Sequence, residues 1–187
     1  PGHHAAPTRG MGFCIFNNVA IAARYVQNRY HLRRVLIVDW DVHHGNGTQE
    51  TFYSDPTVMY FSTHQYPFYP GSGSAEERGK GAGWGSTFNV PLDAGTSEEE
   101  FIRIYREKLK PEALKFRPDF VLISAGFDAH IGDLLGSLRM TEEGFATVTR
   151  IVKEIAEESC QGRLVSVLEG GYNRKALARS VELHILA

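Results

Sequence analysis

Two carboxylates and two imidazoles follow a short apolar run near the start of the chain. Asp39, Asp41, His43 and His44 come directly after the run at 35–38. In extended backbone, residues two positions apart project from the same face, so Asp41 and His43 leave the strand end side by side. A carboxylate oxygen and an imidazole nitrogen both bind zinc. The segment therefore supplies half of a zinc-type coordination sphere.

A third ligand is offered by Asp128, which follows the apolar run at 121–125. Two Asp and one His leave coordination positions open, as a catalytic zinc site requires. A single Asp at a strand end is more often a helix cap or a turn former. Only the joint pattern favours a metal centre.

Other side chains have the chemistry to act beside such a metal. A histidine of the adjacent pair His3 and His4 is a natural general base for bound water, although a His-His pair alone is weak evidence. Asp39 can hold a histidine N–H and raise its basicity. Tyr172 follows a flexible Gly-Gly pair, and its hydroxyl can meet a developing oxyanion, although a buried tyrosine commonly has a structural role. Loop aromatics at 13 and 68–69 are core residues or the walls of a channel for an apolar chain.

The elements that must position these residues alternate along the chain. We expect strands at 35–38, 57–62, 87–90, 119–125 and 163–168, and helices at 17–30, within 45–54, at 97–116, at 141–159 and from 174 onward. This alternation is typical of an α/β fold with a mostly parallel sheet. Ligands bind beyond the carboxyl ends of such strands, where the candidate residues lie. The segment at 61–85 is long for a plain connector, so we expect it to line the site.

The composition argues against several other classes of protein. The chain has 187 residues, 42% of them hydrophobic and 22% charged, with a net charge of −2, which fits one soluble domain. No basic stripe indicates direct nucleic-acid binding, and no apolar run approaches the ~20 residues that span a membrane. Cys14 and Cys160 do not form a disulfide framework, so a reducing compartment is the default. We expect the cytoplasm, or also the nucleus in a eukaryote.

The ends of the sequence indicate a piece of something longer. The chain starts at Pro1 without a Met and stops at Ala187 inside a helical pattern. We therefore expect residues 1–187 to be part of one catalytic domain whose N-terminal and C-terminal portions are missing. Part of the sheet would then be unpaired. Its free edge could pair with a second copy of the chain or with a partner chain.

Five separated motifs resemble the zinc-dependent histone deacetylase family, in that family's order and over nearly the whole chain. They are Pro1-Gly-His-His-Ala5, Gly12-Phe-Cys14, Asp39-Trp-Asp-Val-His-His-Gly-Asn-Gly-Thr48, Gly126-Phe-Asp-Ala-His130 and Glu169-Gly-Gly-Tyr-Asn173. The match is nearest to class II and to bacterial deacetylase-like amidohydrolases. The resemblance implies a three-layer α/β/α, arginase/deacetylase-like fold. It also implies a hydrolase that removes acetyl or other acyl groups from protein lysine side chains.

The resemblance gives each candidate a role. It implies one Zn²⁺ ion per active site, with the ligands Asp41, His43 and Asp128. It implies a catalytic set of His3, His4, Tyr172, Asp39 and Asn46. It implies substrate contacts by Phe13, Tyr69, Leu135, Gly170 and Gly171. Asn46 stands where class I members have Asp, which removes a charge and should leave His4 less readily protonated.

The resemblance also implies bound potassium. One K⁺ site would be formed by Asp39, Asp41, His43, Ser62 and Thr63. A second would be formed by Phe52, Asp55, Val58 and Ser86. The ligands would be largely backbone carbonyls, whose hard oxygens suit an alkali ion.

Three other functions are compatible with parts of this pattern. An arginase-like two-metal site needs a carboxylate two residues after His43, and Gly45 stands there, so one zinc is favoured. Acetylpolyamine deacetylases can carry an acidic gatekeeper where this chain has Leu135, which favours acyl-lysine or another uncharged acyl-amide. A non-catalytic acyl-lysine reader would usually lose a ligand or the tyrosine, and both are kept here.

Overall fold

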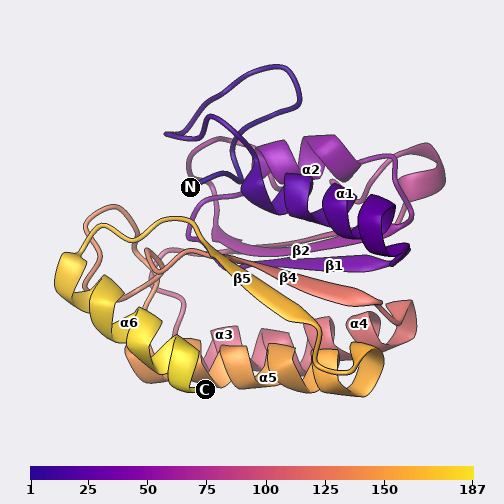
Figure 1. Ribbon diagram of the computed structural model, residues 1–187. Helices are drawn as coiled ribbons and strands as arrows, with labels where there is room; N and C mark the ends of the chain where they lie inside the picture. The colour runs from indigo at the N-terminus through magenta and orange to yellow at the C-terminus, as the bar shows by residue number, and fades with distance from the viewer.

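Strand β1 (Val35–Asp39) is buried along its whole length. In this computed structural model, which describes residues 1–187, Val35 and Ile37 pack into one apolar cluster and Leu36 and Val38 into another. Alternate residues of a strand face opposite sides, so an all-apolar run suits a strand that is covered on both faces. Helices provide that cover above and below the sheet (Figure 1).

The sheet has five strands, all parallel, in the order β3-β2-β1-β4-β5. The other strands are β2 (Val58–Gln65), β3 (Thr87–Leu92), β4 (Phe120–Ala125) and β5 (Leu164–Leu168). Asp39 at the end of β1 pairs with Ser62 on one side and Ser124 on the other. The chain segments that follow β1, β2, β4 and β5 therefore emerge at the same edge, as the sequence predicted.

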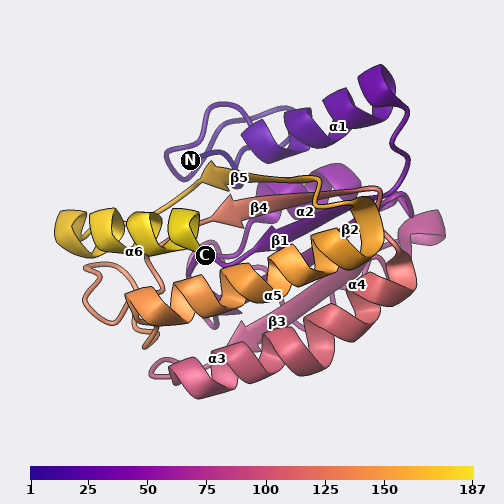
Figure 2. The ribbon, with the colours of Figure 1, turned by 60° about the horizontal axis from the view of Figure 1, so that its bottom comes forward.

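The helices form two layers. One face of the sheet carries α1 (Asn18–Tyr30) and α2 (Asn46–Phe52), and the other carries α3 (Glu98–Ile104), α4 (Lys110–Phe116), α5 (Glu142–Cys160) and α6 (Arg174–Leu186) (Figures 1 and 2). The three-layer α/β/α prediction is confirmed. The expected helix at 97–116 runs through, but a π-helical turn at Tyr105–Leu109 interrupts its α-helical pattern.

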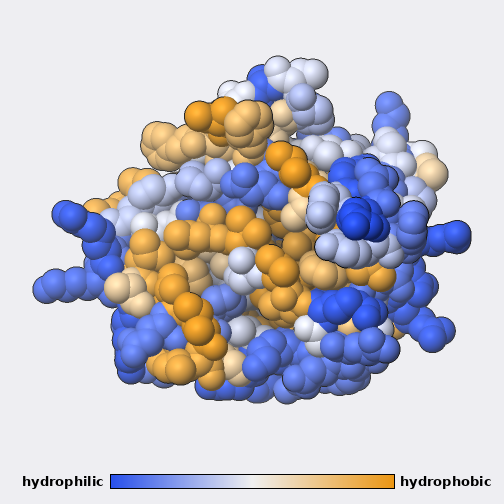
Figure 3. Space-filling view, in the orientation of Figure 1, coloured by the Kyte–Doolittle hydropathy of each residue, from blue (hydrophilic) through white to orange (hydrophobic).

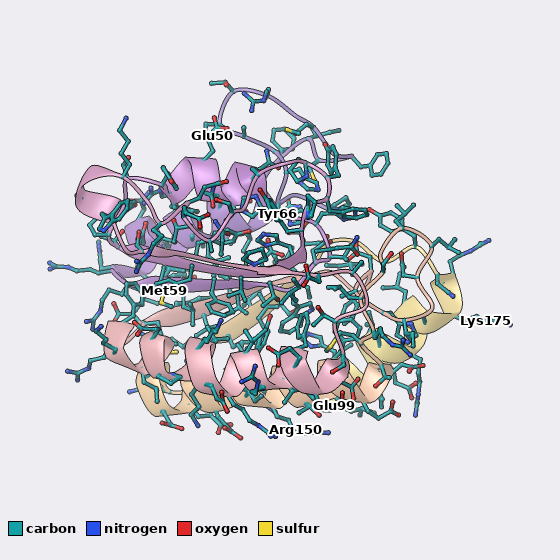
Figure 4. All side chains as sticks on the ribbon, turned by 180° about the vertical axis from the view of Figure 1, so that it is seen from behind. Glu50, Met59, Tyr66, Glu99, Arg150 and Lys175 are labelled. Carbon is teal, nitrogen blue, oxygen red and sulfur yellow. The ribbon has the colours of Figure 1, made fainter.

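Side-chain caps explain where several helices begin. Asn17 accepts from the Ala20 N–H, Ser97 from that of Glu100, and Thr141 from that of Gly144. Each cap satisfies a backbone donor that has no partner within its helix. The polar faces of α3 and α5 point outward, as Glu99 and Arg150 do in Figure 4.

Strands β2 and β5 differ in how far they are buried. Strand β2 runs to Gln65, three residues beyond its predicted end at Ser62, and stays buried throughout. Strand β5 is an outer strand, and Val165 and Leu168 are about half exposed. Apolar surface gathers in the middle of Figure 3, where β5 lies in front in Figure 1. Cys14 and Cys160 are free and buried, and none of the helices has the length and apolar character to cross a membrane.

Candidate active site

Asp41, His43 and Asp128 meet beyond the ends of β1 and β4. One ligand atom from each lies within 4.8 Å of the others, and all three residues are buried. His43 Nδ1 is 3.0 Å from Asp41 Oδ1 and 3.2 Å from Asp128 Oδ2. Backbone donors orient the carboxylates, because the Val42 N–H donates to Asp128 and the Gly170 N–H donates to Asp41, each at 2.8 Å.

The donor set fits a divalent metal such as zinc. Asp128 Oδ2 is fully buried and, although His43 Nδ1 is near it, accepts no hydrogen bond, which is costly for a carboxylate unless a cation binds it. Burial and the charge of Asp41 raise the pKa of Asp128 to about 7. Burial alone would lower the pKa of His43, but Asp128 and Asp41 outweigh it and raise the pKa to about 9. Two crowded carboxylates and one imidazole therefore form a site that favours positive charge.

His3 lies between two of the aspartates. Its Nδ1 donates to Asp39 Oδ2 at 2.9 Å, and its Nε2 is 3.7 Å from Asp41 Oδ1. The Tyr60 hydroxyl also donates to Asp39 Oδ2, at 2.9 Å. Burial acts to lower the pKa of His3, but the charges of Asp39 and Asp41 raise it well above its usual value. His3 is therefore poised to carry a proton.

His4 has the opposite setting. Its Nδ1 is 2.8 Å from Asn46 Oδ1, a neutral acceptor. Burial, followed by the positive charge of His3, lowers the pKa of His4 to about 4. The two rings lie 4.1 Å apart between centroids, so a proton on one disfavours a proton on the other. His4 is thus the neutral member of the pair and can accept a proton.

Tyr172 closes the site from the segment after β5. Burial and the nearby Asp128 and Asp41 charges raise the pKa of Tyr172, so its hydroxyl stays protonated and can donate. Gly170, two residues before it, lies against the metal-site carboxylates, where a Cβ atom would collide with Asp128 Oδ2. Gly171 has φ +144°, a conformation that favours glycine.

A cavity of about 520 Å³ leads to these groups. Its lining residues are His4, Gly12, Phe13, His43, Tyr69, Leu135 and Tyr172. Phe13 and Tyr172 are 6.5 Å apart between ring centroids, and Tyr69 is 5.1 Å from His4. The aromatic walls suit an extended apolar chain that ends at polar groups. The predicted contacts Phe13, Tyr69 and Leu135 thus line one cavity, whereas Gly170 and Gly171 lie outside its lining.

Three further residues contact this site, and of these the sequence had pointed to Phe68, as a loop aromatic, and to Glu169, within a motif. Phe68 stacks on His43, with centroids 5.3 Å apart and planes at 15°. Glu169 Oε2 accepts the N–H groups of Gly2 and His3, at 2.5 and 3.1 Å. Tyr60 reaches Asp39 because the β1–β2 register pairs Tyr60 with Ile37. Tyr60 had no signal in the sequence, and the Glu169 contact joins residues at opposite ends of the chain, so no local pattern predicts it.

The structure gives contacts for part of each set of residues expected to bind potassium. In the first, Ser62 pairs with Asp39, and Thr63 follows on β2. In the second, the Phe52 carbonyl accepts the Asp55 N–H at 2.9 Å, and Ser86 Oγ is 3.3 Å from the Asp55 carbonyl oxygen. The Asp55 carboxylate forms an ion pair with Arg24, with Arg24 Nη1 2.7 Å from Asp55 Oδ2. The ligands that this second group could offer to a potassium ion are therefore its backbone carbonyl oxygens.

Comparisons with known proteins identify the family. A model of the histone deacetylase domain matches residues 1–187. Histone deacetylase 10, chloroplastic, of Oryza sativa subsp. japonica is 48% identical over 97% of this chain and 41% of its own length. A probable deacetylase of Archaeoglobus fulgidus is 46% identical over 100% of this chain and 52% of its own. The chain thus spans about half or less of these relatives.

Solved structures give the same result. The crystal structure of the HDA15 HD domain superposes with a TM-score of 0.94 at 43% identity, covering 99% of this chain and 52% of that one. A fold match at this identity, together with a domain match over every residue, leaves no ambiguity about descent. The chain belongs to the histone deacetylase family.

Proposed function

We propose that this chain carries the active site of a zinc-dependent hydrolase that removes acetyl or other acyl groups from lysine side chains. The observation that carries the proposal is the convergence of His43, His4 and Tyr172 on one aromatic-walled cavity. A metal-binding residue, a proton acceptor and a hydroxyl donor thus meet at one point. Metal-assisted amide hydrolysis uses those three functions.

The chain's own residues account for the proton transfers. A zinc ion held by Asp41, His43 and Asp128 would polarise the amide carbonyl and lower the pKa of the attacking water. His4, with a pKa lowered to about 4 by burial and by His3, accepts the water's proton. The pair then delivers a proton to the departing amine, with Asp39 fixing the His3 ring through Nδ1. The Tyr172 hydroxyl donates to the oxyanion.

The substrate is an acyl-lysine protein or a small acyl-amide. Leu135, at the cavity wall, offers no charge to a polycation. One relative, the polyamine deacetylase HDAC10 of Mus musculus, is 45% identical over 97% of this chain. An acetylpolyamine is therefore the second candidate, and the apolar Leu135 favours acyl-lysine.

Activity on a substrate panel tests the proposal. The full-length protein is assayed on acyl-lysine peptides and on acetylspermidine, with and without a metal chelator, and its zinc content is measured. We expect hydrolysis of the peptides and its loss with chelator. Hydrolysis that survives complete metal removal contradicts the metal mechanism. Acetylspermidine cleavage without peptide cleavage establishes the polyamine alternative, and stoichiometric zinc without any hydrolysis establishes the acyl-lysine reader.

Two K⁺ ions complete the proposed cofactors. The first would bind among Asp39, Asp41, His43, Ser62 and Thr63, next to the zinc ligands. The second would bind the carbonyl oxygens of Phe52, Asp55, Val58 and Ser86. Exchange of K⁺ for Na⁺ during the activity assay, at constant ionic strength, tests both sites together.

A further inference from the structure

The carboxylate of Asp133 joins two walls of the active-site cavity from outside it. Its Oδ2 accepts the Tyr172 N–H at 2.7 Å and the Asn173 N–H at 3.1 Å, while its Oδ1 accepts the Leu135 N–H at 2.9 Å. Leu135 and Tyr172 line the cavity, whereas Asp133 does not. One side chain thus connects the backbone positions of the two lining residues.

A second contact also joins the loop around Asp133 to the segment that carries Tyr172. The Asn173 side-chain amide donates to the Gly132 carbonyl at 2.7 Å. Asn173 Oδ1 also caps α6 by accepting the N–H groups of Lys175 and Ala176. The loop around Asp133 is therefore attached to the start of a helix. Asp133 accepts two of these three hydrogen bonds between the segments, so it is the main link.

The segment that carries Tyr172 needs such a link. Gly170 and Gly171 precede the tyrosine, and glycine leaves the backbone free to take several conformations. Gly171 itself has φ +144°. An oxyanion donor contributes only if it is held in place before the reaction, and a misplacement of 1 Å can cost about 10² in rate. On the chain, Asp133 is the side chain that receives the Tyr172 N–H.

We propose that Asp133 is a positioning residue that fixes the Tyr172 hydroxyl and the Leu135 side chain relative to each other across the cavity. The proposal rests on the proposed function, because it acts through the oxyanion role of Tyr172. Asp133 touches neither substrate nor metal in this scheme. Its effect on kcat through the oxyanion must therefore vanish when the Tyr172 hydroxyl is absent.

A double-mutant cycle tests this dependence on the full-length protein. Asp133→Ala should lower kcat by about tenfold or more through misplacement of the donor, with zinc content unchanged. In the Tyr172→Phe background, Asp133→Ala should change kcat by less than about twofold, because no donor remains to be misplaced. Losses that multiply independently overturn the proposal. Asp119→Ala is the matched control, because Asp119 also accepts a backbone N–H, from Arg34, remote from the cavity.

A conservative variant separates the two links. The amide of Asp133→Asn has one acceptor oxygen, which can satisfy Tyr172 and Asn173 together or Leu135, but not both sides. We expect the oxygen to accept the N–H groups of Tyr172 and Asn173. The kcat of Asp133→Asn should therefore be within a few-fold of wild type. A loss equal to that of Asp133→Ala would contradict positioning through these hydrogen bonds.

Hydrogen exchange gives a readout that needs no turnover. In Asp133→Ala, the amides of Leu135, Tyr172 and Asn173 should exchange faster, while those of β1 and β4 keep wild-type protection. Unchanged exchange at the three amides overturns the proposal. A wild-type protein that cleaves no acyl-amide would instead reject the proposed function, and the exchange experiment still decides whether Asp133 holds the two walls.

Discussion

Two adjacent histidines have opposite protonation preferences because their partners differ in charge. His3 faces the carboxylates of Asp39 and Asp41, whereas His4 faces the neutral amide of Asn46. Burial disfavours a proton on both rings, and only His3 has enough nearby negative charge to overcome it. The difference divides the pair into a proton carrier and a proton acceptor.

Asn46→Asp tests this division. A carboxylate 2.8 Å from His4 Nδ1 would favour the imidazolium, and an opposite charge at such range typically raises a pKa by about 1–3. The acidic limb of kcat/KM, which reports protonation of the base, should therefore move to higher pH by roughly 1–3 pH units. A pH–rate profile measures it. Asn46→Ala, which adds no charge, should not move the limb upward, and an unmoved limb in Asn46→Asp would exclude His4 as the base.

Tyr172→Phe tests the oxyanion donor. The ring stays and the hydroxyl is lost, so zinc content should be unchanged while kcat falls on the order of 10²–10³. Steady-state kinetics and metal analysis of the same sample measure both. Near-normal turnover would reject the assigned role.

At the scale of elements, the parallel sheet places several strand ends at one edge. Asp41 and His43 follow β1, Asp128 follows β4, and Gly170 follows β5. Gly170 donates its N–H to Asp41 and leaves no room for a side chain beside the Asp128 carboxylate. The segment after β5 is thus a structural part of the metal site, although it supplies no ligand.

Gly170→Ala tests that close approach. The added Cβ atom would push against the carboxylates of Asp128 and Asp41, so the ligands must shift. We expect zinc affinity to fall by about 10–100-fold, the range seen when groups that orient metal ligands are disturbed. Competition with a chelator measures the affinity. Leu168→Ala, at the half-exposed last residue of β5, should bind zinc as the wild type does. Wild-type affinity in Gly170→Ala would contradict the prediction.

At the scale of the whole molecule, a buried polar network fastens the long segment after β2 to the sheet. His64 Nε2 donates to the Gly73 carbonyl at 2.8 Å, and His64 Nδ1 accepts from Ser62 Oγ at 2.9 Å. His44 contacts Ser72 Oγ through Nδ1, also at 2.8 Å. These contacts hold the segment that carries Phe68 and Tyr69 over the metal site.

The network makes stability depend on pH. Burial lowers the pKa of His64 from 6.5 to about 4, so the unfolded chain binds this proton more readily than the folded one. Stability from His64 is present above about pH 6.5 and is lost as pH falls toward 4, by up to about 1.4 kcal/mol per pH unit. His64→Gln should therefore lose less unfolding free energy between pH 7 and 5 than wild type. Denaturant titrations measure it, with the exposed His31→Gln as control, and equal losses in His64→Gln and wild type would contradict the prediction.

The sequence by itself determined the strands, the helices and the residues with metal-site chemistry. Apolar runs such as 35–38 predict strands, and capping residues such as Asn17, Ser97 and Thr141 mark the starts of helices. Both act over a few residues, so the sequence alone shows them. The i, i+2 spacing of Asp41 and His43 likewise fixes which face they share. The general rule for parallel sheets then places the strand ends together.

Only the tertiary structure decided which distant groups touch. Glu169 reaches the backbone of Gly2 and His3, Tyr60 reaches Asp39, and Asp133 reaches Tyr172. These contacts depend on strand register and on how each loop returns to the sheet, which no local pattern encodes. The tertiary structure also decides which histidine carries a proton, because the pKa values of His3 and His4 depend on burial and on charges that folding brings near.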